Sequence, residues 1–187
     1  MISDTYIPEL ERKFCRFETV PEVGEDAVIA GYASVFGTPD QGGDTVARGA
    51  YARSLEALAG SGRRVKMLWQ HDPAQPIGVW DEVREDARGL YVRGRILDAI
   101  ARGREALALI RAGAIDGLSI GYRTVKAERD GKGRRLLADL DLWEVSLVTF
   151  PMLPEARIGA KTVAEEEALA RAVAETFAEA GRLIARD

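Results

Sequence analysis

Ser119 lies between two glycines in Gly117-Leu118-Ser119-Ile120-Gly121, a Gly-x-Ser-x-Gly sequence. In α/β-hydrolases this sequence forms a sharp strand-to-helix turn that presents a nucleophilic serine, and the triad histidine follows later in the chain. Here the residues after Ser119 alternate as in a strand, and the single histidine, His71, precedes the serine. The sequence therefore argues against a nucleophile elbow. Taken alone, Ser119 is better explained as a strand serine beside closely approaching backbones.

His71 must carry any histidine chemistry of this chain. In VKMLWQH the period-2 pattern places Val65, Met67, Trp69 and His71 on one face of a strand, so the imidazole is expected to end a buried row. A histidine in such a place is commonly a packed core or rim residue. The sequence HDPAQPIG follows, and its two prolines and glycine predict a rigid turn at the strand end, where functional side chains often lie.

Glu144 introduces a carboxylate into an apolar row. Alternation in DLDLWEVSLVTFP predicts one face made of Leu140, Leu142, Glu144, Ser146, Val148 and Phe150. A buried carboxylate is costly without a partner, so an imidazolium or an arginine is expected beside it. Acyl transfer needs a nucleophile, a base and an orienting acid, and Ser119, His71 and Glu144 form that minimum set.

Composition excludes several other kinds of site. One cysteine, Cys15, and one histidine make a zinc site and an internal disulfide improbable, and no cofactor is expected. A net charge of -4 argues against general nucleic-acid binding. Because no apolar run approaches the ~20 residues of a membrane span and the N-terminus lacks a signal peptide, we expect a soluble cytoplasmic protein.

Strands dominate the first 150 residues. They are expected at 13–20, 27–37, 64–71, 77–86 and 89–97, then at 118–128 and 135–150, with a hairpin connection ending at Gly89. Two short helices are expected. The first lies within 48–62 and buries Ala50, Leu55, Leu58 and Ala59; the second is capped by Asp98, buries Ala106, Leu107 and Ile110, and ends at Gly113. This order predicts a β-rich α+β fold, an antiparallel-rich barrel or sandwich.

A helical tail is expected after the prolines at 151 and 154. From Lys161 the sequence is helix-forming, with apolar residues at seven-residue spacing. We divide the chain into a domain of residues 1–158 and a tail of residues 159–187. The tail would pack on the domain or a partner, or serve as a cleavable or targeting segment.

Four separated motifs resemble the prohead maturation proteases of tailed phages, a family related in fold to the herpesvirus assemblins. They are GYASVFGTPDQGGDTVARGAYARSL, MLWQHDPAQPIG, GREALALIRAGAIDGLSIGYR and LWEVSLVTFPMLPEARI, and the match spans about residues 14–158. The resemblance implies a serine protease with a herpesvirus-protease-like antiparallel β-barrel ringed by short helices.

The resemblance also implies roles for individual residues. The family's catalytic histidine falls on His71 and its nucleophile on Ser119. The third member is a histidine in the herpesvirus enzymes, and here Glu144 is expected to replace it. Asp141, Asp139 and Asp72 are weaker choices for the third member.

Two loops complete the expected site. Backbone N–H groups around Pro151 to Leu153, from Met152 or Leu153, are candidates for the oxyanion hole. The PDQGGD segment, with Asp40 and Asp44, either shapes a substrate groove or is an ordinary acidic loop.

By resemblance, the substrate is the major capsid protein precursor or a scaffold protein, with self-processing and a homodimer as further expectations. The site of action is then the procapsid within the bacterial host cytoplasm. A non-catalytic capsid-assembly or scaffold protein that keeps the fold is the alternative. A glycosidase with paired carboxylates such as Asp40 with Asp44, or Glu82 with Glu85, has no support beyond acidic content.

Overall fold

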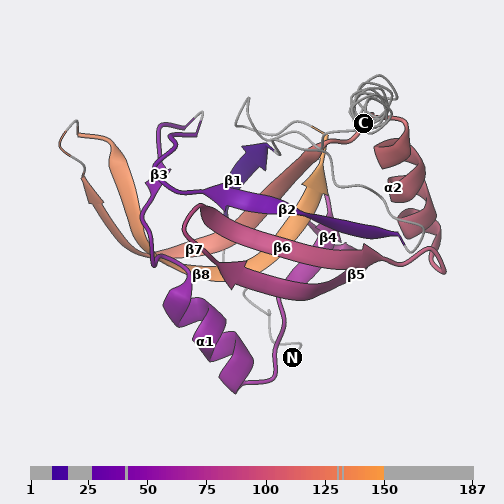
Figure 1. Ribbon diagram of the computed structural model, residues 1–187, viewed down its shortest axis with the longest axis horizontal. Helices are drawn as coiled ribbons and strands as arrows, with labels where there is room; N and C mark the ends of the chain where they lie inside the picture. The colour runs from indigo at the N-terminus through magenta and orange to yellow at the C-terminus, as the bar shows by residue number, and fades with distance from the viewer. Residues whose placement is uncertain (1–9, 17–26, 41, 130, 132, 150–187) are drawn as a thin grey trace, which may run out of the picture.

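The computed structural model describes residues 10–16, 27–40, 42–129, 131 and 133–149 of the 187-residue chain (Figure 1). The strands are β1 (Glu11–Arg16), β2 (Val28–Val35), β3 (Thr45–Val46), β4 (Lys66–Trp69), β5 (Asp72–Glu85), β6 (Gly89–Ile96), β7 (Gly117–Arg129) and β8 (Arg135–Val148). The helices are α1 (Ala52–Gly60) and α2 (Ala101–Arg111). The predicted β-rich character with short helices is confirmed, and only the two-residue β3 was not expected.

The described strands form one curled sheet in the order β1-β7-β8-β4-β5-β6-β2, with β3 paired to β8. Its two edge strands, β1 and β2, contact each other, so the sheet curls into a partly closed barrel. Figure 1 shows α1 below the sheet and α2 at its right-hand side. The two helices therefore pack against the barrel at separate places.

The sheet is mixed, which corrects the expected antiparallel barrel. β3 and β4 both run parallel to β8, whereas the other neighbouring pairs are antiparallel. Parallel neighbours must be joined by a long connection, and here β4 and β8 are separated by three further strands and α2. Local sequence patterns predict hairpins between successive strands, so they did not predict this parallel pairing between distant strands.

Residues in and just before α1 accept hydrogen bonds from the part of β8 that lies between its pairings with β3 and with β4. The N–H of Leu140 donates to the carbonyl of Ala50, and the N–H of Leu142 donates to Ser54 Oγ, each at 2.9 Å. Buried N–H groups need such acceptors. Ser54 is therefore the buried residue of α1, while Leu55 and Leu58 of the predicted stripe are half-buried and Ala59 is exposed.

Helix α2 starts later than its predicted cap. Ile100 occupies the N-cap position, and the Asp98 carbonyl instead accepts a hydrogen bond from Arg104 Nη1 at 2.9 Å. The predicted end is confirmed: Gly113 has a φ of 69°, and its N–H donates to the Ile110 carbonyl at 2.8 Å. The buried stripe of Ala106, Leu107 and Ile110 is also as expected.

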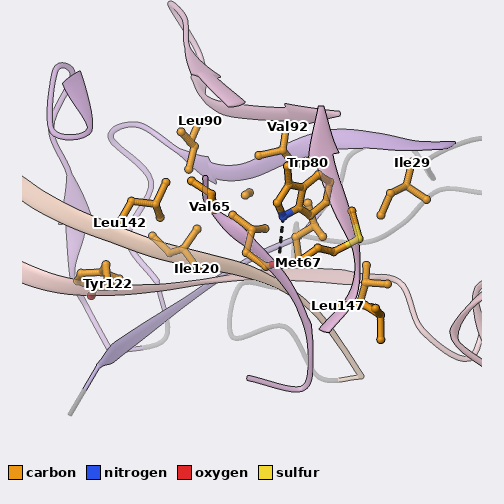
Figure 2. Packing of buried hydrophobic residues seen from close by; sticks show 14 of the residues in the cluster. Ile29, Val65, Met67, Trp80, Leu90, Val92, Ile120, Tyr122, Leu142 and Leu147 are labelled. Atoms are coloured by element: carbon orange, nitrogen blue, oxygen red, sulfur yellow. Dashed lines mark hydrogen bonds between the residues drawn. The ribbon is translucent and has the colours of Figure 1, made fainter. Parts of the chain in front are cut away.

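The core fills the inner side of the curled sheet. Figure 2 shows Trp80 of β5 among aliphatic side chains from the surrounding strands, and its Nε1–H donates to the Val145 carbonyl at 3.2 Å. Ile120 of β7 and Leu147 of β8 belong to this core. Because strand side chains alternate between faces, Ser119 and Ser146, their neighbours, lie on the opposite, outer face.

Candidate active site

His71 lies in the two-residue turn between β4 and β5. Trp69 pairs with Asp72, and the intervening Gln70 and His71 have φ values of 51° and 62°. Positive φ at both central residues is typical of a type I′ hairpin turn, which usually needs Asn or Gly. The prediction that His71 ends a strand row is therefore wrong, because β4 stops at Trp69 and a left-handed turn sets the direction of the imidazole.

The expected turn in HDPAQPIG is wrong as well. Strand β5 already begins at Asp72 and includes both prolines of this segment. The pairing with β4 jumps from Trp69–Asp72 to Leu68–Pro76, so the residues between Asp72 and Pro76 form an irregularity within the ladder. Proline is tolerated there because it has no N–H to contribute to the ladder.

A β-bulge at Trp143 turns Glu144 to the outer face. Gly121 pairs with Glu144 and Tyr122 with Leu142, which leaves Trp143 as an extra residue on β8. One extra residue shifts every following side chain to the other face. Leu142 and Val145 consequently both join the core. The predicted single row through Leu140, Leu142, Glu144, Ser146 and Val148 is therefore wrong beyond Leu142.

The His71 imidazole contacts the Glu144 carboxylate. Nδ1 lies 2.5 Å from Oε1, and each side chain is only 5% exposed. The partner expected for a buried glutamate is thus an imidazole. A carboxylate at Nδ1 favours the tautomer with its proton on that nitrogen, which places the basic lone pair on Nε2.

Ser119 lies on β7 beside this pair. It is opposite Ser146 in the β7–β8 ladder, and directly opposite residues of an antiparallel pair point to the same face. Its side chain is fully buried, and Oγ donates to the carbonyl of Lys13 on β1 at 3.3 Å. The fold therefore brings Ser119, Glu144 and the His71 turn together around Ser146.

Ser146 was missed as a candidate for function, although it appeared in the predicted row. Its Oγ accepts a hydrogen bond from the His71 backbone N–H at 3.1 Å and lies 2.5 Å from Glu144 Oε2. The available signal was spacing, since a serine two residues after a strand glutamate shares its face. No sequence pattern showed that the His71 backbone would reach it.

The weaker candidates for the third residue have other partners. Asp139 pairs with Arg53 at 2.8 Å, and Asp141 accepts hydrogen bonds from Arg123 and from the exposed Trp143. Asp72 accepts hydrogen bonds from the Ala74 N–H and the Gln75 amide. These hydrogen bonds lower the pKa of Asp72, that from Gln75 most. Among these acids, the structure places Glu144 against His71.

The acidic loop of PDQGGD is fastened to β1 by a buried lysine. Lys13 Nζ donates to Asp40 Oδ2 at 2.9 Å and to the Asp44 carbonyl at 2.6 Å, and its side chain is fully buried. The same lysine supplies the carbonyl that accepts the Ser119 hydroxyl. The loop is thus linked, through one residue, to the strand beside Ser119.

Arg135 joins the same loop to β8. Its guanidinium contacts Glu11 at 2.7 Å and Asp44 at 2.9 Å. The hydrogen bond from Arg135 is the main cause that lowers the pKa of Glu11. Nearby, burial raises the pKa of Tyr122 well above its usual range, so this phenol stays neutral. Asp40 and Asp44 therefore have structural partners, as do Glu82 with Arg84 and Glu85 with the Gly49 N–H.

In the described part of the chain, no group of three or more His, Cys, Asp or Glu side chains is placed to hold a metal ion. Within those same residues, no helix has the length and apolar character needed to cross a membrane. The oxyanion-hole candidates at 151–153, the tail of 159–187 and the Cys15 side chain lie outside what the structure describes.

The fold is similar to that of the capsid assembly protease of bacteriophage T4. The two structures match with a TM-score of 0.57 at 16% sequence identity, over 74% of this chain and 98% of that chain. This comparison supports the architecture and its topology.

Sequence relatives point to the same group of viruses. The prohead protease of Enterobacteria phage HK97 is 34% identical over 140 residues, which cover 73% of this chain and 61% of that protein. The capsid polyprotein of Pseudomonas phage PAJU2 is 31% identical over 102 residues, or 50% of this chain and 15% of that protein. The chain therefore matches less than two thirds of either relative's length.

These similarities define a class, the capsid proteases of tailed phages. Residues 17–170 match the model of the caudovirus prohead serine proteases. This chain belongs to that family.

Proposed function

We propose that this chain is a serine endopeptidase of head maturation, with Ser119 as nucleophile, His71 as general base and Glu144 as the acid that orients the base. The observation that carries the proposal is the buried contact of 2.5 Å between His71 Nδ1 and Glu144 Oε1, on the face of the sheet that Ser119 shares. A histidine with a carboxylate on one ring nitrogen has the arrangement that activates a serine.

The proposed reaction transfers one proton between Ser119, His71 and the leaving amine. His71 Nε2 takes the Ser119 hydroxyl proton as Oγ bonds to the substrate carbonyl carbon, and it returns that proton to the leaving amine. Water repeats the sequence on the acyl-enzyme, which releases the second product and restores the serine. Glu144 remains ionised throughout and stabilises the imidazolium, an interaction strengthened by its burial.

Ser119 must change its hydrogen bond for this chemistry. In the structure its Oγ donates to the Lys13 carbonyl and is fully buried. Attack therefore requires the hydroxyl proton to be directed to His71 Nε2 and a path to be opened for the substrate. Strand β1, which carries Lys13, is the element whose displacement would do both.

We infer that the substrate is the major capsid protein precursor or a scaffold protein, cleaved inside the procapsid in the host cytoplasm. The relatives named prohead protease and capsid polyprotein support this inference. Self-processing and a homodimer belong to the same proposal. Residues 151–153 remain our candidates for the oxyanion hole, and residues 159–187 for a helical tail.

Fluorophosphonate labelling with peptide mapping tests the proposal. The adduct is expected on Ser119, and it should be lost in Ser119→Ala and in His71→Ala. Co-expression with the capsid precursor provides the second assay, in which Ser119→Ala should abolish processing while leaving the circular dichroism spectrum unchanged. Processing at the normal rate by Ser119→Ala would refute the assignment.

The complete burial of Ser119 favours one second candidate, a non-catalytic assembly protein that keeps the protease fold. This candidate predicts that deletion of residues 161–187 blocks incorporation into particles, whereas Ser119→Ala changes nothing. Labelling of assembled particles separates the two functions, because an enzyme activated by assembly acquires its Ser119 adduct there.

A further inference from the structure

We propose that Ser146 is a positioning residue that holds the base and the orienting acid of the site in one geometry. The inference rests on the proposed function, and it adds a residue that the sequence patterns did not single out. Ser146 is fully buried on β8, two residues after Glu144 and directly opposite Ser119.

The direction of both hydrogen bonds follows from the groups involved. The His71 backbone N–H can only donate, so Ser146 Oγ accepts at 3.1 Å. A serine hydroxyl carries one proton, and Glu144 Oε2 lies 2.5 Å away, so that proton is donated to the carboxylate. Both partners are thereby connected through one oxygen atom.

The two bonds fix different parts of the catalytic pair. One holds the backbone of His71, whose φ of 62° is sparsely populated for a residue with a side chain. The other occupies Glu144 Oε2, so that Oε1 remains directed at His71 Nδ1. A charge-assisted hydrogen bond of this kind is stronger than a neutral one. Ser146 therefore couples the turn conformation to the orientation of the carboxylate.

A second bond supports the same turn but lacks this coupling. The Gln70 N–H donates to the Leu147 carbonyl at 3.0 Å, which anchors the turn to the β8 backbone. Loss of the Ser146 hydroxyl would therefore leave the turn attached to β8. It would free the imidazole and the carboxylate to move relative to each other.

Steady-state kinetics on a peptide from the cleaved precursor form the first test. We expect Ser146→Ala to lower kcat by about tenfold to a hundredfold, the usual range for a hydrogen bond to a charged group, with KM unchanged within about twofold. The matched control is Ser34→Ala. Ser34 is also fully buried on a strand, but its Oγ has no hydrogen-bond partner among the described residues, so kcat should stay at the wild-type value.

NMR provides a readout that needs no activity. His71 is the only histidine, so the ring signals belong to one residue. The Nδ1–H proton, strongly deshielded by Glu144, should be present in wild type and in Ser34→Ala. In Ser146→Ala it should move upfield or disappear through exchange with water. Should the alanine variant fail to fold, Ser146→Cys keeps the shape with a weaker donor and should show the same change in part.

The outcomes separate the two proposals. If wild type and Ser119→Ala cleave equally, the proposed function fails. The His71 Nδ1–H signal of wild type and Ser146→Ala still tests the role of Ser146 in that case. If wild type cleaves and Ser146→Ala matches it in kcat and in the Nδ1–H signal, the positioning role is overturned. A fluorophosphonate adduct on Ser146 would also overturn it, because Ser146 would then be the nucleophile.

Discussion

Gly121 is paired with Glu144 across strands β7 and β8, and the Glu144 carboxylate packs against it. A Cβ atom at Gly121 would come within 2.1 Å of Glu144 Oε1 and 2.8 Å of its carboxyl carbon. The second glycine of the Gly-x-Ser-x-Gly sequence thus has a steric reason: it leaves room for the acid that contacts His71. Across the neighbouring strands β7 and β8, Gly121 pairs with Glu144 and Ser119 pairs with Ser146.

Gly121→Ala should consequently displace the carboxylate from His71. We expect kcat for precursor cleavage to fall by about tenfold or more, because a misplaced orienting group costs transition-state stabilisation. The control is Gly60→Ala at the end of α1, where the added methyl group meets nothing within 4 Å. Equal activity of the two variants would contradict the steric role of Gly121.

The turn that carries His71 should be sensitive to residue shape at Gln70. Valine is strained at positive φ, whereas asparagine tolerates it. We expect Gln70→Val to be less stable than Gln70→Asn by about 1–2 kcal/mol in urea unfolding. Both variants alter the 2.6 Å hydrogen bond from Gln70 to Thr149. Equal stability would show that the turn relaxes without cost.

Lys13 should be a strong determinant of stability. Lys13→Met leaves Asp40 without its ammonium partner in a buried place, and removal of one member of a buried ion pair typically costs about 3–5 kcal/mol. Adding Asp40→Asn should recover part of this loss, because the remaining charge is removed while Oδ1 can still accept the Asp44 N–H. Free energies of unfolding for the two single variants and the double variant provide the measurement. Strictly additive losses would argue against the pairing.

Acid should weaken the β5–β6 hairpin through Asp86. Burial opposes its ionisation, but hydrogen bonds from the Arg88 N–H, the Tyr32 hydroxyl and the Arg84 guanidinium lower its pKa to about 2. A depressed pKa contributes stability above the unfolded value of 3.8, and that contribution is lost as pH falls toward 2. The stability advantage of wild type over Asp86→Asn should therefore be largest above about pH 4 and shrink below it. A difference that does not change with pH would contradict this.

Much of the site was predictable because the chain has a single histidine and a buried carboxylate needs a partner. The chain has one histidine, and Glu144 was expected in an apolar row, so His71 was one of the two kinds of partner, with an arginine, predicted for this carboxylate. The strand and helix order also followed from alternation, glycines and prolines. The roles of Ser119, His71 and Glu144 in catalysis remain predictions.

What could not be predicted depends on backbone conformation and long-range pairing. The left-handed turn at Gln70 and His71 has no glycine or asparagine to signal it, and the bulge at Trp143 leaves no mark in an alternating sequence. The turn changes where the His71 side chain points, and the bulge changes the face of every β8 residue after Trp143, but neither changes the type of element. Ser146 was missed for the same reason, since its partner is a backbone N–H far away in the chain.

The parallel pairing of β4 with β8 has a consequence for timing during synthesis. The His71 turn is made early, but the residues that orient it, Glu144 and Ser146, belong to the last described strand. A ribosome-bound or truncated chain that stops before this strand contains both the serine and the histidine and lacks the acid. Under the proposed mechanism, such a chain has no oriented base, so cleavage of the proposed substrate must wait until β8 has been synthesised.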